Sequence, residues 1–170
     1  MTSDAVFGFV GVVLGSLTTS VLTVYKERLV GSREADVRDQ QYERDRRASR
    51  DVFQRESILA LQTAVMDLIK AAYDELDRVL AEFETTGVWS ARQWETPTAA
   101  GWSAAVLSLE TSRARVFDEE VRSRATKLRK VAGESIWAGD LESAKRISMV
   151  IEPLQIQFHE AVATALAALY

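Results

Sequence analysis

The stretch AVFGFVGVVLGSLTTSVLTVY, residues 5–25, is the starting point because it holds twenty-one residues without a charged side chain. As an α-helix rising about 1.5 Å per residue it would be roughly 31 Å long, which matches the hydrocarbon thickness of a bilayer. A cleaved signal peptide would need a basic segment before the apolar run and a small-residue cleavage site after it. Here Asp4 precedes the run and Tyr25-Lys26-Glu27-Arg28 ends it. We therefore predict a single retained transmembrane helix.

The charges that flank this segment predict its orientation. Lys26, Arg28, Arg33 and Arg38 follow it, and no Lys or Arg precedes it. Basic residues stay preferentially on the cytoplasmic side of a membrane. We expect a single-pass protein of the cell inner (cytoplasmic) membrane, with the N-terminus outside and the C-terminal domain in the cytoplasm, and with membrane lipid as its first partner.

Small residues share one side of the predicted transmembrane helix. Gly8, Gly11 and Gly15 are spaced by three and four residues, and Gly11-Val-Val-Leu-Gly15 is a GxxxG motif. Such a motif allows two helix backbones to approach closely, which would make the protein a homo-oligomer. The alternative is that the motif arises by chance, because glycine is common in transmembrane helices.

A charged helical stalk is predicted over residues 26–52. Residues 26–56 carry nine basic and eight acidic side chains. Nucleic-acid binding needs uncompensated positive charge, so we expect no nucleic-acid partner. Gly31-Ser32 marks the place where this helix could be interrupted.

Residues 53–170 are predicted to form an antiparallel bundle of three to four helices, which makes the chain all-α. The first helix should start near Val52 and stop near Thr85-Thr86-Gly87, because glycine commonly ends helices. Two adjacent apolar rows form a stripe broad enough to pack against more than one neighbour. The first row is Leu59, Gln62, Met66, Ile69, Tyr73, Leu76, Leu80 and Phe83, and the second is Ile58, Leu61, Val65, Leu68, Ala72 and Val79.

The stretch 87–102 is the least regular part of this domain and contains VWSARQWETPTAAGW. Three of the four tryptophans, Trp89, Trp94 and Trp102, lie in it. Exposed tryptophans are enriched in binding surfaces, so they are a candidate partner surface for an unknown protein. The alternative, which we favour, is that the rings close one end of the bundle and their N–H groups reach loop backbone.

Two more helices are predicted, over about 103–132 and 140–169. The first should be capped by Ser103 and end before Gly133; its basic second half either binds phosphate or acidic partners or is a solvated face. The second should be capped by Asp140 and should kink or restart at Pro153. Its apolar end, AVATALAALY, should lie in the centre of the bundle or under another subunit.

The sequence contains no recognisable catalytic pattern. It has no cysteine, and its one histidine, His159, is not part of a Glu-x-x-His motif, because residue 156 is isoleucine. No nucleophile elbow, phosphate loop or dinucleotide-binding motif occurs. We therefore expect no enzymatic activity, no cofactor and no metal.

The order of these segments resembles that of a loose class of uncharacterised actinobacterial single-span membrane proteins. Those proteins open with a Gly- and Val-rich span, continue into an Arg/Glu-rich stalk, and end in a helical domain. The corresponding stalk here is YKERLVGSREADVRDQQYERDRRASR, residues 25–50. The resemblance implies a bacterial cytoplasmic membrane and cytosolic helices, and it implies no reaction or active-site residue.

The expected function is that of a non-enzymatic, membrane-anchored scaffold or interaction protein at the cytoplasmic face. A membrane-active effector in phage exclusion, lysis or defence, with transmembrane helices assembled in the bilayer, is the alternative.

Overall fold

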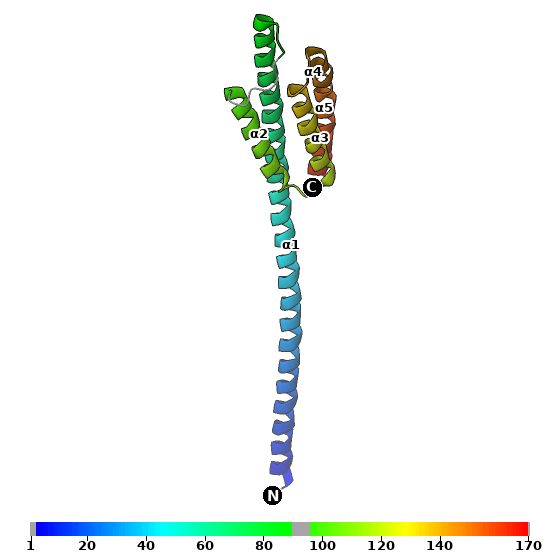
Figure 1. Cartoon of the computed structure of the whole chain (residues 1–170). Helices are drawn as coiled ribbons and strands as arrows, with labels where there is room; N and C mark the ends of the chain where they lie inside the picture. The colour runs from blue at the N-terminus through cyan, green and yellow to red at the C-terminus, as the bar shows by residue number, and fades with distance from the viewer. Residues whose placement is uncertain (1–2, 90–95, 170) are drawn as a thin grey trace. The chain divides into compact units, whose positions relative to one another are not determined.

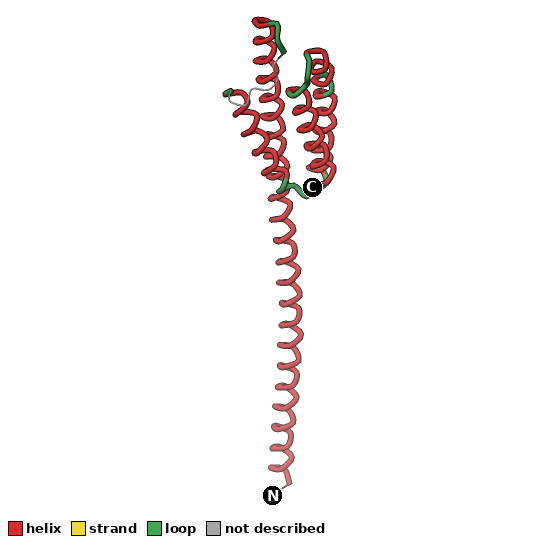
Figure 2. Tube along the Cα trace, viewed as in Figure 1, coloured by secondary structure: helices red, strands yellow, loops and turns green. Residues whose placement is uncertain are grey.

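The computed structural model describes the backbone of residues 3–89 and 96–169, and the side chains of residues 37–89 and 96–169. Over these residues the chain is all-α, as predicted, and no strand is present (Figures 1 and 2). The helices are α1 (Ser3–Thr86), α2 (Pro97–Arg113), α3 (Glu119–Ile136), α4 (Leu141–Ser148) and α5 (Ile151–Ala167). The chain divides into two compact units, Met1–Ser49 and Arg50–Tyr170, and α1 contributes to both.

The first unit is helical over its described backbone. Side chains 37–49 are all exposed, and Arg47 forms an ion pair with Glu43 at 4.0 Å. The helix passes through Gly31 and Ser32, so the predicted interruption is wrong. One glycine inside a helix costs only about 1 kcal/mol, which does not end a helix by itself.

In the two side-chain ranges given above, no helix is both long and apolar enough to cross a membrane. The predicted transmembrane segment, residues 5–25, lies outside those ranges. It therefore stays a prediction.

The second unit packs its helices around one apolar core. From α1 the core takes a row that advances by alternating steps of four and three residues, the spacing of one helix face that packs against neighbours. Its members are Gln54, Ile58, Leu61, Val65, Leu68, Ala72, Glu75 and Val79. The second apolar row predicted from the sequence is thus the buried one. Leu109, Leu128 and Phe158 complete the core from α2, α3 and α5.

The helix predicted over 103–132 is two helices, so this expectation was wrong. Thr96 caps α2 by accepting the backbone N–H of Ala99 at 3.1 Å, ahead of the predicted cap Ser103. A turn after Arg113 ends α2, and Asp118 caps α3 by accepting the Val121 N–H at 2.9 Å. Asp is a strong helix-capping residue, which explains why a new helix starts here.

The ends of the other helices follow their local chemistry. Gly87 ends α1 with φ 70°, and its N–H donates to the Phe83 carbonyl at 2.8 Å. Asp140 caps α4 through the Ser143 N–H at 2.8 Å. Pro153 lies in the first turn of α5, where its missing N–H costs nothing. The predicted stop near Gly87, cap at Asp140 and restart at Pro153 are confirmed.

Candidate interaction surface

Large apolar side chains are exposed along one side of α1 within the second unit. They recur every seven residues, so they lie on one helix face with a drift of only about 20° per step. Each is at least 40% exposed. They are Val52, Leu59, Met66 and Tyr73, and we call them the α1 ridge. Three of them belong to the apolar row that the sequence analysis named first, so that row is only partly buried.

A second exposed row with the same spacing follows α5. Met149 lies in the turn before α5 and is 76% exposed, Ile156 is 54% exposed, and Ala163 is also exposed. We call Met149, Ile156 and Ala163 the α5 ridge. Ala163 is much smaller than Met149 and Ile156, so the three side chains of this row do not protrude equally.

Two side-chain contacts fix the alignment of α1 with α5. Gln62 and His159 share a hydrogen bond between Nε2 and Nδ1 at 3.1 Å, and the Gln155 amide contacts the Met66 sulfur at 3.3 Å. Four residues forward on α1 correspond to four residues back on α5, so the helices are antiparallel. The two ridges and these polar side chains form one surface, which we call the α1–α5 face.

His159 is a structural part of this face. Its ring lies against Phe158 at 5.7 Å between centroids, while Phe158 itself is fully buried. The described residues bring no group of three or more His, Cys, Asp or Glu side chains together for a metal ion. The histidine thus joins α5 to α1.

Trp89 and Trp102 are only partly accessible. The Trp89 indole N–H donates to the Ala138 carbonyl at 2.8 Å, and its ring meets Phe83 edge-on at 6.0 Å. The Trp102 ring lies against Gly133 in α3. Both rings pack on the core, whereas Trp94 lies outside the described residues. These contacts match the closing role that we favoured for Trp89 and Trp102, and the partner-surface prediction stays open.

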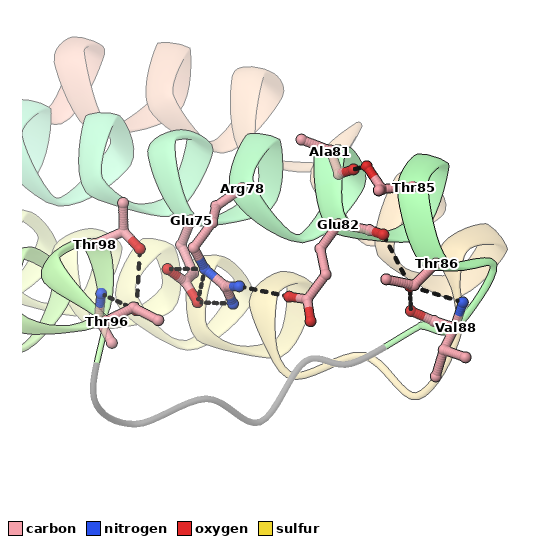
Figure 3. A network of polar contacts seen from close by, with 10 residues as sticks. Glu75, Arg78, Ala81, Glu82, Thr85, Thr86, Val88, Thr96 and Thr98 are labelled. Atoms are coloured by element: carbon pink, nitrogen blue, oxygen red, sulfur yellow. Dashed lines mark hydrogen bonds and ion pairs between the residues drawn. The ribbon is translucent and has the colours of Figure 1, made fainter.

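The core-facing row of α1 includes one buried carboxylate. Glu75 is 2% exposed and accepts hydrogen bonds from Arg78 at 2.7 and 3.2 Å, and Arg78 also reaches Glu82 at 2.9 Å (Figure 3). These bonds, led by the one to Glu75, raise the pKa of Arg78. The charged groups of Glu75, Arg78 and Glu82 pair with one another, which is typical of a structural ion pair.

The basic segment of the predicted helix 103–132 is largely paired within the chain. Arg113 bonds Glu110 at 2.6 Å, Arg124 bonds Glu120 at 2.6 Å, and Arg122 contacts Glu119. Such neutralised pairs favour the solvated-face interpretation over an anion-binding surface.

The predicted self-association residues Gly8, Gly11 and Gly15 lie in the part of α1 whose side chains the structure does not describe. Their role in self-association therefore stays a prediction.

Gln54 is a buried polar residue that the sequence analysis did not identify. Gln54 is 5% exposed, donates to the Arg115 carbonyl at 3.1 Å and accepts the Phe117 N–H at 2.8 Å. It therefore ties α1 to the turn between α2 and α3. Its place four residues before Ile58, in line with the buried row, was the available signal.

Comparisons with protein-family models, with curated proteins and with solved structures found no match.

Proposed function

We propose that this protein is a membrane-anchored helical scaffold that holds a protein partner at the inner face of the cytoplasmic membrane and catalyses no reaction. The observation that carries the proposal is the α1–α5 face. Its six large side chains, Val52, Leu59, Met66, Tyr73, Met149 and Ile156, are between 40% and 76% exposed. Exposed apolar surface that is gathered on one face and bordered by charge is typical of protein interaction sites.

Anchoring is supported by the uncharged residues 5–25 and by the basic residues that follow them. To test it, the full-length chain is expressed in a bacterium and the cells are fractionated. We expect the chain in the membrane fraction, resistant to high salt and alkaline washes and released by mild detergent. Full-length chain in the soluble fraction would refute the anchor.

Orientation is tested on the same membranes with a protease. We expect trypsin to cut the Arg-rich residues 26–56 in inverted vesicles and to leave them intact in spheroplasts. The reverse pattern would contradict a cytoplasmic helical domain.

The membrane-active effector is the second candidate, favoured by the shared side of Gly8, Gly11 and Gly15 in the predicted span. It is tested by inducing expression in the presence of a membrane-potential dye. A collapse of the potential that Gly11→Ile and Gly15→Ile abolish would support this function over the scaffold. Unchanged potential and growth would reject it.

A further inference from the structure

We propose that the α1–α5 face binds the same face of a second copy of this chain, with α1 of each protomer packed against α5 of the other. The inference deepens the proposed scaffold function by naming the partner. It rests on that function in one respect: two anchors in one membrane require the α1 helices of both copies to run in the same direction.

The exposed area of the two ridges is large enough for an interface with a second copy of the chain. At roughly 200 Å² for a fully exposed large side chain, the exposed fractions of the six large ridge residues amount to about 600 Å² per protomer. Two copies would then bury about 1,200 Å², which lies in the range of specific protein interfaces. The estimate covers the ridges alone, so the flanking residues would add to it.

Symmetry brings the two ridges into register. A two-fold axis parallel to the helices places α1 opposite the partner's α5 and keeps every residue at its level along the axis. The Gln62–His159 and Met66–Gln155 contacts set those levels. In that register Leu59, Met66 and Tyr73 lie within one residue, about 1.5 Å along the axis, of the partner's Ala163, the partner's Ile156 and the partner's Met149, in that order. Each ridge residue of α1 from 59 to 73 thus meets a ridge residue of α5.

The polar side chains that lie between the two ridges are compatible with this arrangement. Gln62, Gln155 and His159 each have one polar or sulfur partner within their own chain, and each keeps that contact when the face is covered. A polar layer at one level of a helical interface also disfavours slipped registers.

Charge at the edge of the face agrees with the same register. Lys70 lies level with residue 151 of α5, which brings its ammonium group near the partner's Glu152. Both side chains are exposed. Lys70 also bonds Asp74 at 2.6 Å in its own chain. A cation therefore meets a carboxylate across the proposed interface.

The test uses disulfide crosslinking of the full-length chain in mild detergent, since the chain has no cysteine of its own. Leu59→Cys and Ala163→Cys are placed on separate chains that are then mixed, so every disulfide joins two protomers. We expect a mixed disulfide in high yield. Adding Ile156→Glu to both chains should lower the yield at least tenfold, because it places a charge at the centre of the face.

Leu107→Glu is the matched control, because Leu107 is 69% exposed on α2 and lies outside the face. It should leave the yield unchanged. All substituted side chains are exposed, and circular dichroism melts check that each variant folds. No mixed disulfide, an equal yield with Ile156→Glu, or Leu59→Cys chains that crosslink best with one another would overturn the proposal.

The crosslinking test of the interface and the fractionation test of the membrane anchor can fail independently. Chains that fractionate with membranes but give no mixed disulfide would reject this interface and leave the anchor in place. Soluble full-length chains that give the mixed disulfide would reject the anchor and keep the interface.

Discussion

Glu75 carries a carboxylate into the core-facing row of α1, where it is held by Arg78. We predict that Arg78→Met destabilises the full chain by about 3 kcal/mol, because it leaves a buried negative charge without its main partner. The double variant Glu75→Leu with Arg78→Met should recover most of this loss, since it removes both charges. Urea denaturation of the two variants in detergent measures both values. Equal losses would show that packing around the pair, rather than charge, sets the stability.

Gln54 forms hydrogen bonds with two backbone groups of the turn between α2 and α3. We predict that Gln54→Leu destabilises the chain by about 2 kcal/mol, because it leaves the Arg115 carbonyl and the Phe117 N–H unpaired. Gln54→Glu keeps the acceptor for Phe117 but places a carboxylate oxygen against the Arg115 carbonyl, so it should also destabilise the chain near neutral pH. The same urea titrations measure the order of the two variants. A Leu variant as stable as the parent chain would show that water replaces the glutamine.

Asp140 links stability to pH. The pKa of Asp140 is lowered below its ordinary value of 3.8, and the largest cause is the hydrogen bond that its carboxylate accepts from the Ser143 backbone N–H. The unfolded chain therefore binds the proton more tightly, so this contribution is present above the ordinary pKa and is lost as pH falls through the lowered one. We predict that Asp140→Asn, which keeps a capping oxygen, shows a smaller drop in Tm between about pH 6 and about pH 3 than the parent chain. An unchanged drop would contradict the assignment.

At the scale of the helix, replacing each of two glycines by alanine should change the stability of the chain in opposite directions. Gly133 lies inside α3, and a Cβ there would stand 3.6 Å from Trp102, an ordinary contact. We predict that Gly133→Ala stabilises the chain by about 0.5–1 kcal/mol, because alanine favours the helix. Gly87 has φ 70°, so Gly87→Ala should destabilise it by about 1 kcal/mol. Thermal melts compare the two variants. A destabilising effect of Gly133→Ala would contradict the first of these predictions.

Helix ends could be predicted wherever one residue carries a strong local signal. Gly87, Asp140 and Pro153 act in the structure as the sequence indicated. The turn at residues 114–118 was missed, because it contains neither glycine nor proline and lies in an Arg-rich segment that favours a helix by propensity. Asp118 caps α3, yet in the sequence it also fits a pair with Arg122.

The candidate surface could be predicted only in part. Its α1 residues belong to an apolar row that the sequence showed, but periodicity does not tell which of two adjacent rows faces the core. The Gln62–His159 contact joins residues 97 positions apart, so it depends on how the helices align. The exposure of Met149 and Ile156 follows from that alignment and has no local signal.

At the scale of the whole molecule, packing is concentrated in the second unit. Side chains 37–49 are all exposed, whereas the core-facing row of α1 between residues 54 and 79 is buried. Helix stability in proteins comes mostly from an apolar face packed against neighbours, and side-chain ion pairs on an exposed helix add only about 0.2–0.5 kcal/mol each. One continuous helix should therefore open with very different free energies along its length.

Hydrogen exchange on the detergent-solubilised chain measures this difference. We predict amides of residues 37–49 to exchange at least about 100-fold faster than those of residues 57–79, because local opening in the exposed part breaks no core contact. Ile156→Glu serves as the control, since it disrupts the proposed interface of the second unit and should leave exchange in 37–49 unchanged. Slow exchange in 37–49 would mean that another helix covers this segment, and self-association would then extend beyond the α1–α5 face.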